Sequence, residues 1–390
     1  MSMLPQDASA PLLPALSAAD RRRYARHLSL PQIGANGQRR LKGARVLIVG
    51  AGGLGSPAAL YLAAAGVGTL GLLDFDRVDE SNLQRQVLFT TEDLGQPKAE
   101  RARARLAALN PQVNVIAHQI ELCAANVRET FAHYDLIVDG SDRVGTRYLV
   151  NDACVLYRKS LVSAAVHRFE GQAMSYVPGR GPCYRCLFPQ IDADALPNCA
   201  EAGVLGVLPG VMGSLQATEA IKLLLGIGEP LVGRVLVYDA LSLRFDTFRI
   251  ARRPECAVCG DHPSILMPQD PPGYCTLEEQ QNVESISASA LEEQLQSTTA
   301  ADTLRLIDVR EPDEFALAHL SGAINLPLSR IEQQGVVPAG GEGVTVFVCR
   351  SGVRSRRAGA LARRAGIPRV LQLEGGLAAW QASVDPSFAL

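Results

Sequence analysis

The sequence predicts an α/β protein with two domains, a larger one built on a Rossmann-like mixed sheet and a smaller α/β domain after it. Three observations lead to this prediction. The chain has 390 residues, which exceeds the size at which a single hydrophobic core stops growing. Short apolar runs rich in β-branched residues alternate with helical patterns, as in sheets with crossover helices. A segment rich in Pro, Gln, Ser, Thr and Glu interrupts this alternation, and such a change of composition indicates a linker.

The larger domain begins with apolar runs that favour parallel strands. They lie at residues 45–50, 68–74, 134–139 and 160–166. Later runs at residues 172–177, 234–238 and 245–250 lack long helices between some neighbours. Antiparallel strands need only a short connection, whereas parallel strands need a long crossover. We therefore expect a mixed sheet, with the later strands antiparallel.

The smaller domain follows a cluster of prolines and a glycine at residues 268–273. Beyond this cluster, residues 304–309 and 344–349 favour buried strands, and each is followed by a helix-competent segment. The predicted division is a domain over residues 1–265, a linker over residues 266–284 and a second domain over residues 285–390.

Composition excludes some classes of function. A net charge of −2 and a pI near 6.3 provide no broad cationic field for phosphate backbones, so nucleic acid is not an expected partner. The first residues lack a basic segment followed by an apolar one, so no signal peptide is expected and a cytoplasmic location is predicted. The uncharged stretch at residues 46–73 is long enough for a membrane helix, but its seven glycines and Pro57 favour a strand, a turn, a helix and another strand.

A glycine-rich turn indicates a nucleotide site. The sequence Gly50-Ala-Gly-Gly-Leu-Gly55 matches G-x-G-x-x-G, follows a predicted strand and precedes a predicted helix. Its backbone N–H groups and the helix dipole can receive phosphate. Asp74 ends the next strand, where a carboxylate can accept hydrogen bonds from ribose hydroxyls. These two features indicate an adenosine nucleotide, and taken alone they favour an NAD-dependent dehydrogenase among Rossmann-type functions.

Charged residues farther along the chain favour ATP chemistry. Asp76 and Asp79 precede the run at residues 81–86, which contains Arg85, and Lys98 follows soon after. Attack of a carboxylate on the α-phosphorus of ATP brings anions together and releases pyrophosphate, so these two cations could neutralise the moving charge. Asp142 lies beyond the strand at residues 134–139, where it could hold Mg²⁺.

Six motifs in order resemble the MoeB/ThiF family of adenylyltransferases, relatives of the ubiquitin-activating enzymes that activate molybdopterin-synthase and thiamine sulfur carriers. They lie at residues 50–55, 73–76, 81–86, 95–98, 139–142 and 201–203, within a likeness that covers about residues 20–262. The resemblance implies a nucleotide-binding set of Arg26, Gly53, Asp74, Ser81, Asn82, Leu83, Gln84, Arg85, Lys98, Ser141 and Asp142. It implies phosphate contacts for Asn82 and Arg85, a place near the transferred group for Lys98 and magnesium binding for Asp142.

The same resemblance implies a homodimer, because Arg26 matches a basic residue that reaches into the partner subunit's site. One position departs from the family's pattern. Arg143 stands where close relatives usually carry Asn after the metal-binding aspartate. The carboxylate of Asp142 is retained.

Two C-x-x-C pairs predict a structural zinc site with four thiolate ligands. The predicted ligands are Cys183, Cys186, Cys256 and Cys259. A Cys₄ site leaves no open position for water, so this zinc would be structural and not catalytic. The alternative is a pair of redox-active dithiols, although neither pair follows the first strand of a thioredoxin-like pattern.

Cys199 lies at residues 197–203, just before an apolar helix expected near Pro209. By position it resembles the family's crossover-loop cysteine, implied in some members to take the carrier's acyl group transiently. A buried bystander cysteine is the alternative. Cys123, Cys154 and Cys275 belong to no motif, and packing or surface positions explain them.

Cys349 begins an arginine-rich loop at residues 349–355, between a predicted strand and a predicted helix. Helix-terminal N–H groups and Arg350 or Arg354 would favour the reactive thiolate. Phosphatases use a C-x₅-R loop, but Arg354 follows Cys349 by five positions, which gives the shorter C-x₄-R ring of sulfurtransferases.

This segment is similar to single-domain rhodaneses over its length, including residues 306–312, 319–325 and 373–376. The resemblance implies that Cys349 is the sulfur-bearing nucleophile. Asp308 and Arg310 are expected to orient its loop by hydrogen bonds, and Trp380 is expected in the core.

Together these features predict an adenylyltransferase that is also a sulfurtransferase. ATP and the terminal glycine of a carrier give an acyl-adenylate, and the Cys349 persulfide supplies sulfur for a thiocarboxylate, with Cys199 as a candidate reductant of the acyl disulfide. The expected cofactors are ATP, Mg²⁺ and Zn²⁺. The expected partners are a small ubiquitin-like sulfur carrier ending in Gly-Gly, a second copy of the chain, and a cysteine desulfurase or thiosulfate as sulfur donor.

Two other classes stay open at this point. A NAD-dependent oxidoreductase fused to a sulfurtransferase requires nicotinamide binding and an acid–base group, and a non-catalytic carrier-docking scaffold requires no pyrophosphate release. The pathway is equally open, since molybdenum cofactor biosynthesis, thiamine synthesis and tRNA thiolation can all employ such an enzyme.

Overall fold

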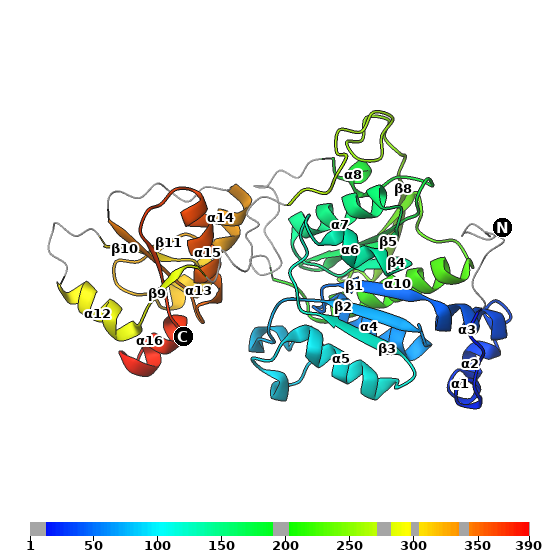
Figure 1. Cartoon of the computed structure of the whole chain (residues 1–390), viewed down its shortest axis with the longest axis horizontal. Helices are drawn as coiled ribbons and strands as arrows, with labels where there is room; N and C mark the ends of the chain where they lie inside the picture. The colour runs from blue at the N-terminus through cyan, green and yellow to red at the C-terminus, as the bar shows by residue number, and fades with distance from the viewer. Residues whose placement is uncertain (1–12, 190–202, 271–281, 298–303, 335–342, 390) are drawn as a thin grey trace. The chain divides into compact units, whose positions relative to one another are not determined.

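A computed structural model describes residues 13–189, 203–270, 282–297, 304–334 and 343–389 of the chain (Figure 1). The described residues form two compact units. The larger unit comprises residues 13–189 and 203–270, and the smaller unit comprises the described residues from 282 onward. The domain boundaries predicted at residues 265 and 285 stay a prediction.

One mixed sheet organises the larger unit, in the strand order β3-β2-β1-β4-β5-β6-β7-β8. The parallel strands are β1 (Arg45–Val49), β2 (Thr69–Leu73), β3 (Asn114–His118), β4 (Leu136–Asp139) and β5 (Ser160–His167). The antiparallel strands are β6 (Glu170–Tyr176), β7 (Arg234–Asp239) and β8 (Arg244–Arg249). The mixed sheet is therefore confirmed, whereas β3 was not predicted because its side chains are half-buried or exposed and its apolar pattern is weak.

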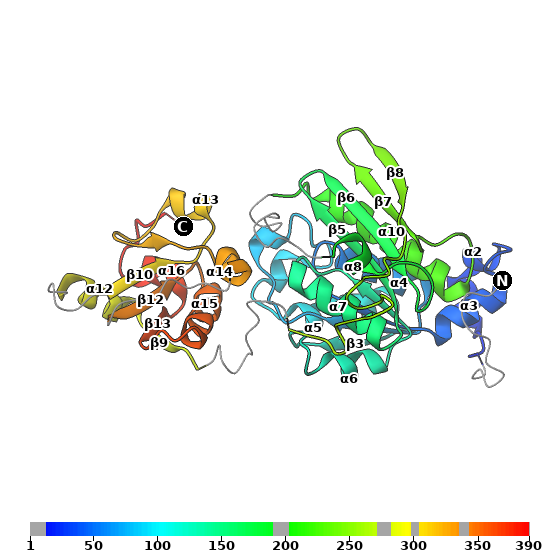
Figure 2. The same ribbon diagram turned by 90° about the horizontal axis from the view of Figure 1, so that it is seen from above.

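Helices cover both faces of this sheet (Figures 1 and 2). One face packs against α3 (Gly34–Gly43), α4 (Gly55–Ala65), α5 (Lys98–Leu109) and α10 (Val207–Leu225). The other face packs against α6 (Val127–Ala132), α7 (Val144–Leu156) and the short α8 (Tyr184–Leu187). The remaining short elements are α1 (Ala18–Arg23), α2 (Ala25–Leu28), η1 (Glu80–Asn82) and η2 (Thr91–Asp93).

The turn between β1 and α4 requires glycine for steric reasons. Gly50 has a φ of +89°, which side-chain-bearing residues rarely adopt. A β-carbon on Gly55 would lie 1.8 Å from the carbonyl oxygen of Gly50. The first turn of α4 therefore lies directly on the loop, and its free N–H groups point to the carboxyl end of the sheet.

The smaller unit has a parallel sheet in the order β11-β10-β12-β13-β9. Its strands are β9 (Glu284–Ile286), β10 (Leu304–Asp308), β11 (Ile324–Asn325), β12 (Val344–Val348) and β13 (Val370–Leu373). Its helices are α12 (Ala288–Ser297), α13 (Pro312–Leu317), α14 (Leu328–Gln334), α15 (Val353–Arg364) and α16 (Gly376–Ser383). Trp380 of α16 is buried in the apolar core on one face of this sheet, as predicted.

Among the described residues, no helix has the length and apolar character needed to cross a membrane. The uncharged stretch at residues 46–73 folds into β1, a turn, α4 and β2, as the sequence predicts.

Candidate functional site

The glycine loop lies at the point where the strand order of the larger sheet reverses. β1 pairs with β2 on one side and with β4 on the other, so the chain leaves β1 between two oppositely directed crossovers. Open α/β sheets bind ligands outside the carboxyl ends of their strands at such a point. The loop, the end of β2 and the end of β4 therefore face one crevice.

Asp74 is fastened to the glycine loop. Its Oδ2 accepts a hydrogen bond from the backbone N–H of Ala51 at 2.8 Å, and its Oδ1 accepts one from the N–H of Asp76 at 2.9 Å. Burial raises the pKa of Asp74 to about 6, against the opposing charge of Lys98. A buried carboxylate beside the loop is suited to accept hydrogen bonds from ribose hydroxyls.

Lys98 is a buried cation at the first position of α5. Its Nζ lies 3.2 Å from Oδ2 of Asp76. Burial alone lowers the pKa of Lys98, but the carboxylates of Asp76, Asp74 and Asp142 outweigh it and raise the pKa above the usual lysine value. The side chain therefore stays charged among three carboxylates, where a fixed positive charge can act on phosphate.

Arg85 lies against the glycine loop at Gly53. A β-carbon on Gly53 would lie 3.5 Å from Cγ of Arg85 and 3.1 Å from Pro209 at the start of α10. The Nη1 of Arg85 donates to the carbonyl oxygen of Ser81 at 3.0 Å. This acceptor is neutral, so the guanidinium keeps its net charge for an anionic ligand.

The other residues of the run at 81–86 differ in what they offer. The backbone N–H and the hydroxyl of Ser81 donate to Asp79 at 2.9 and 2.6 Å, and Nδ2 of Asn82 donates to the Ser81 hydroxyl at 3.3 Å. Leu83 packs against the apolar core. Gln84 lies against Gly206, where a β-carbon would come within 2.3 Å of its Oε1.

Gln86 was not among the predicted site residues, although it ends the motif that contains them. It is buried, and its Oε1 has no hydrogen-bond partner in the part of the chain that the structure describes. A β-carbon on Gly52 would lie 3.6 Å from its Nε2. Its place beside the loop, which sequence spacing alone does not reveal, makes it a further candidate for ligand binding.

The end of β4 carries an exposed aspartate next to a fully buried one. Ser141 donates to Oδ1 of Asp139 from its N–H at 3.1 Å and from its hydroxyl at 2.6 Å. Burial raises the pKa of Asp139, and Arg147 opposes that effect. Asp142 is exposed at the crevice and close enough to Lys98 to affect its pKa. Asp142 can therefore reach a ligand or a metal ion, whereas Asp139 holds the turn.

Arg143 pairs with a carboxylate and lies over an aromatic ring. Its Nη1 donates to Oε1 of Glu121 at 2.9 Å, and its guanidinium lies 5.0 Å from the ring centre of Phe75. Phe75 directly follows Asp74. The arginine therefore extends from the end of β4 to the end of β2.

Arg26 lies far from the crevice of its own chain. It is an exposed residue of α2, which packs against α3. Arg40 of α3 donates to the carbonyl oxygen of Leu225, at the last turn of α10, whereas the first turn of α10 contacts Gly53 through Pro209. A helix of 19 residues is about 28 Å long, so α2 with Arg26 and the glycine loop lie toward opposite ends of α10.

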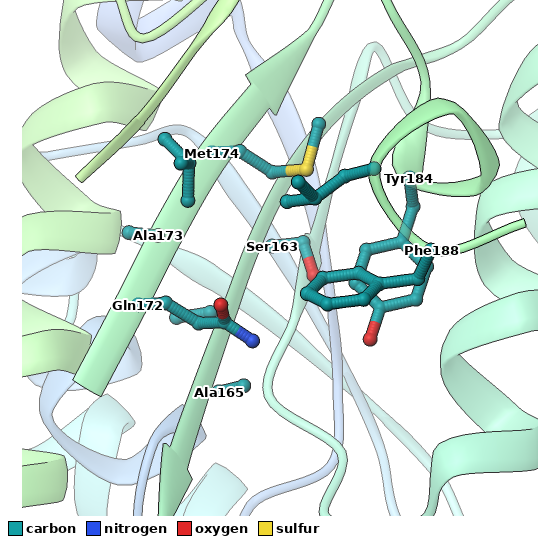
Figure 3. Close-up of a pocket in the computed structure, with 10 residues that line it drawn as sticks. Ser163, Ala165, Gln172, Ala173, Met174, Tyr184 and Phe188 are labelled. Carbon is teal, nitrogen blue, oxygen red and sulfur yellow. The ribbon is translucent and has the colours of Figure 1, made fainter. Parts of the chain in front are cut away.

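A small apolar cavity lies on the face of β5 and β6 that α8 covers (Figure 3). Its volume is about 10 Å³. Ser163 and Met174 line it from the strands, and Tyr184 and Phe188 line it from the α8 side. The hydroxyl of Ser163 also donates to Oδ2 of Asp139 at 3.3 Å. Ser163 therefore connects the cavity to Asp139, which begins the turn that carries Asp142.

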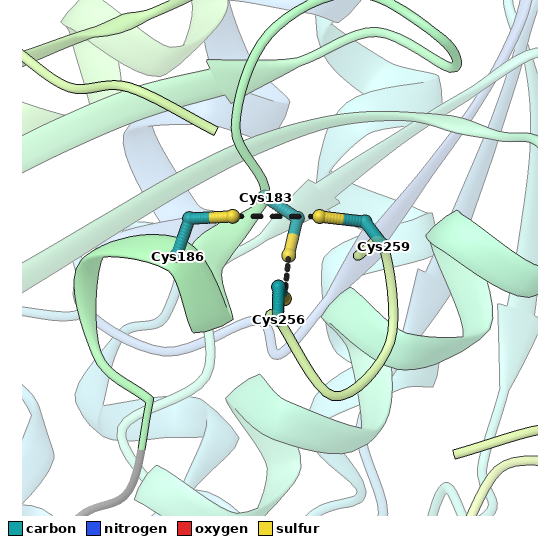
Figure 4. A group of neighbouring side chains, drawn as sticks. All are labelled: Cys183, Cys186, Cys256 and Cys259. Carbon is teal, nitrogen blue, oxygen red and sulfur yellow. Dashed lines mark hydrogen bonds between the residues drawn. The ribbon is translucent and has the colours of Figure 1, made fainter. Parts of the chain in front are cut away.

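The two C-x-x-C pairs meet at one point (Figure 4). The Sγ atoms of Cys183, Cys186, Cys256 and Cys259 all lie within 4.8 Å of one another. The Cys183–Cys256 and Cys186–Cys259 sulfur pairs are 3.7 and 3.4 Å apart. Sulfurs bound tetrahedrally to one zinc ion, each about 2.3 Å from it, lie about 3.8 Å apart, whereas disulfide-bonded sulfurs lie about 2.05 Å apart. The cluster is compatible with zinc, and none of its four cysteines forms a disulfide.

Cys349 of the smaller unit sits at the centre of its loop. Its Sγ accepts hydrogen bonds from the backbone N–H groups of Gly352 and Ser355, at 3.2 and 3.3 Å. A β-carbon on Gly376 would lie 2.3 Å from the carbonyl oxygen of Cys349, so α16 begins against the loop. The loop is thus a fixed ring of donors around a buried sulfur, suited to an anionic thiolate or persulfide.

Acidic residues hold the arginine of this loop. Both terminal nitrogens of Arg354 donate to the carboxylate of Glu314 in α13, at 2.6 and 2.8 Å. Arg310 pairs with Asp308 at 2.7 Å and also donates to the carbonyl oxygen of Ala318, just after α13. The Asp308–Arg310 pair therefore holds the end of α13, the helix that carries Glu314, and Glu314 is a residue that the sequence did not single out.

Cys199 and Cys275 lie outside the described residues, and so do the first two residues of the motif at residues 201–203. Cys123 and Cys154 are buried free thiols within the larger unit. Burial raises the pKa of Cys154 well above the usual thiol value, which fits a packing position.

A nucleotide loop flanked by fixed cations and an exposed aspartate, together with a separate cysteine ring, defines an ATP-using adenylylating enzyme with a sulfurtransferase unit. The comparisons with known proteins agree with this class. The chain belongs to the ThiF family, whose model matches residues 24–258. A rhodanese-like domain matches residues 287–383. The protein is therefore an adenylyltransferase and sulfurtransferase, and ATP use follows from the family.

Two relatives and one solved structure illustrate the similarity. The chain is 42% identical to the probable adenylyltransferase/sulfurtransferase MoeZ of Mycobacterium tuberculosis, over 96% of each protein. It is 54% identical to the sulfur carrier protein adenylyltransferase of Thermus thermophilus, over 65% of this chain and 96% of that protein. The crystal structure of E. coli MccB with ATP superposes with a TM-score of 0.55 at 26% identity, covering 63% of this chain and 75% of MccB.

Proposed function

We propose that the enzyme adenylates the C-terminal glycine of a ubiquitin-like sulfur carrier and then converts it to a thiocarboxylate with sulfur from Cys349. The observation that carries the first step is the convergence of Arg85, Lys98 and Asp142 on the glycine loop. A hydride-transfer enzyme would not need this charged set. The second step is supported by the donor ring around Cys349.

In the first step, a carboxylate oxygen of the carrier attacks the α-phosphorus of ATP, and the bond to the bridging oxygen of pyrophosphate breaks. Loop N–H groups and Arg85 hold the phosphates, and Asp74 holds the ribose. Lys98 offsets charge that develops as pyrophosphate leaves. Asp142 is the residue that would hold Mg²⁺, which neutralises phosphate charge when bound.

In the second step, the terminal sulfur of the Cys349 persulfide attacks the acyl carbon and AMP leaves. The product is an acyl disulfide on Cys349. Attack of the Cys199 thiol on the Cys349 sulfur would release the thiocarboxylate and leave a Cys349–Cys199 disulfide. An external dithiol would then reduce this disulfide, and a cysteine desulfurase or thiosulfate would reload Cys349.

Two further elements complete the proposal. The Cys₄ cluster would hold a structural zinc ion, which joins the segment at residues 183–186 to that at residues 256–259 and leaves no position for water. A homodimer would bring Arg26 to the nucleotide of the partner subunit, in keeping with its distance from the crevice of its own chain.

The experiment that tests this function is carrier-dependent exchange of labelled pyrophosphate into ATP. Candidate carriers with Gly-Gly termini are supplied to the purified protein with Mg²⁺. Exchange that requires both the carrier and its terminal glycine supports adenylation. Absence of exchange with every such carrier would contradict adenylation and would favour a non-catalytic docking scaffold.

A further inference from the structure

The side chain of Arg143 links the ends of three strands at the nucleotide crevice. It follows Asp142 after β4, its guanidinium lies over the ring of Phe75 after β2, and its Nη1 donates to Glu121 after β3. The distances are 5.0 Å to the ring centre and 2.9 Å to the carboxylate oxygen. Asn at this position would be too short and would carry no charge, so it could not make both contacts.

These contacts hold the guanidinium over the Phe75 ring and leave part of it accessible. Glu121 is buried, with a side-chain exposure of 8%, whereas the side chain of Arg143 is 36% exposed. A planar guanidinium can stack on an aromatic ring on one side and on a second flat group on the other. Arg143 is therefore a preorganised flat surface at the rim of the crevice.

The electrostatics of Arg143 differ from those of the phosphate-binding candidates. Its charge is balanced by the carboxylate of Glu121. Arg85, in contrast, donates to a neutral backbone carbonyl and keeps its net charge. Because the carboxylate of Glu121 neutralises its charge, Arg143 would attract a triphosphate only weakly. The flat face of its guanidinium is still available for stacking.

The position fits the base end of a nucleotide. The phosphates lie against the N–H groups of the glycine loop, and the ribose lies at Asp74, the residue before Phe75. The base then continues past the ribose, between the ends of β2 and β4, and Arg143 spans these two ends.

We propose that Arg143 is a specificity-determining residue whose guanidinium stacks on the purine base of ATP over Phe75, with Glu121 as the residue that positions it. This inference rests on the proposed use of ATP at the glycine loop. The ligand chemistry is a flat nucleobase and not a phosphate.

The test compares two ligands that share the phosphates but not the base. Binding of ATP and of inorganic tripolyphosphate is measured by calorimetry for the full-length protein and for Arg143→Lys and Arg143→Asn variants. Both variants should bind ATP roughly tenfold more weakly, in line with the stacking of bases on planar side chains. Their tripolyphosphate affinity should be unchanged, which also shows that they fold.

Glu121→Gln should produce a smaller loss in the same direction, because the guanidinium keeps Phe75 but loses its charged partner. The matched control is Arg128→Asn, which removes an exposed arginine lying 5.9 Å from the ring centre of Tyr157 in the same unit. This control should leave both affinities unchanged.

Equal losses for ATP and tripolyphosphate would overturn the inference, since they would show a role on the phosphates. Unchanged ATP affinity in Arg143→Lys would overturn it as well. Because these measurements need no carrier, failure of pyrophosphate exchange in the native protein would overturn the proposed function alone.

Discussion

Arg354 and Glu314 form a bidentate ion pair that joins the first turn of α15 to the first turn of α13. Its two N–H···O distances are 2.6 Å from Nη1 to Oε2 and 2.8 Å from Nη2 to Oε1. Burial alone would raise the pKa of Glu314, but Arg354 outweighs it and holds that pKa below the usual value. The same Oε2 of Glu314 accepts the backbone N–H of Glu311 at 3.2 Å. The arginine beside Cys349 is thus held by a carboxylate that is itself fixed by its own helix.

Glu314→Gln should impair sulfur transfer without affecting adenylation. The amide cannot balance the guanidinium, so Arg354 should move and the ring around Cys349 should loosen. We expect at least a tenfold loss of sulfur transfer to cyanide, the size of effect typical when a charged pair that positions an active group is broken. Carrier-dependent pyrophosphate exchange should stay at the native level.

Glu332→Gln is the matched control. Glu332 of α14 pairs with Arg357 of α15, the helix that also carries Arg354. An equal loss of sulfur transfer in both variants would show that Glu314 only stabilises the helix.

Cys349→Ala should separate the two activities of the enzyme. Its sulfur is the acceptor of two backbone N–H groups and lies in a unit distinct from the nucleotide loop. Pyrophosphate exchange should therefore continue, while mass spectrometry detects no persulfide on the chain and no thiocarboxylate on the carrier. Persulfide-dependent thiocarboxylate formation by the alanine variant would refute the assignment of Cys349.

Lys98→Met should lower the rate of adenylation far more than it lowers stability. Loss of one fixed charge at a developing anion costs about 10²–10³ in kcat. Of the three carboxylates left behind, Asp76 is 46% exposed and Asp142 is exposed, so water can solvate both. The buried Asp74 keeps its hydrogen bonds from the backbone N–H groups of Ala51 and Asp76. Steady-state pyrophosphate exchange should show the loss mainly in kcat.

Lys159→Met provides the control for removing a lysine, because Lys159 donates to the carbonyl oxygen of Tyr134 at 2.7 Å, just before the amino end of β4. Near-native exchange by Lys98→Met would contradict the assigned role.

Zinc removal should destabilise the larger unit. Cys183→Ala removes one of the four proposed ligands, which come from segments more than sixty residues apart, and metal binding is coupled to folding in such sites. We expect loss of bound zinc by elemental analysis and a fall in Tm of roughly 10 °C, equivalent to about 3 kcal/mol for a unit of this size. Cys123→Ala, outside the cluster, should retain the metal. Retention of zinc by Cys183→Ala would contradict the site.

The sequence predicted this fold well where each residue's role depends on its neighbours along the chain. The apolar runs of β1, β2, β4 and β5, the glycine turn and the cysteine spacing are all local patterns. Long-range pairings left no such pattern. Glu314 and Arg354 are forty residues apart, and Glu121 and Arg143 are separated by twenty-two, so only the folded chain reveals these pairs.

Nucleotide affinity should fall as the pH drops below about 6. The pKa of Asp74 is about 6, above its usual value of 3.8, because the carboxyl is buried. The carboxylate proposed to accept hydrogen bonds from the ribose hydroxyls therefore becomes protonated as the pH falls through this value, and ATP binding that requires the carboxylate should weaken about tenfold per pH unit below it. The unfolded chain takes up the same proton only near pH 3.8, so this group stabilises the fold as the pH falls between the two values.

Asp74→Asn, which does not titrate, should lack both effects. Calorimetry of ATP binding and thermal unfolding from pH 7.5 to 4.5 measure the differences, and parallel pH profiles for the two proteins would exclude Asp74 as the titrating group.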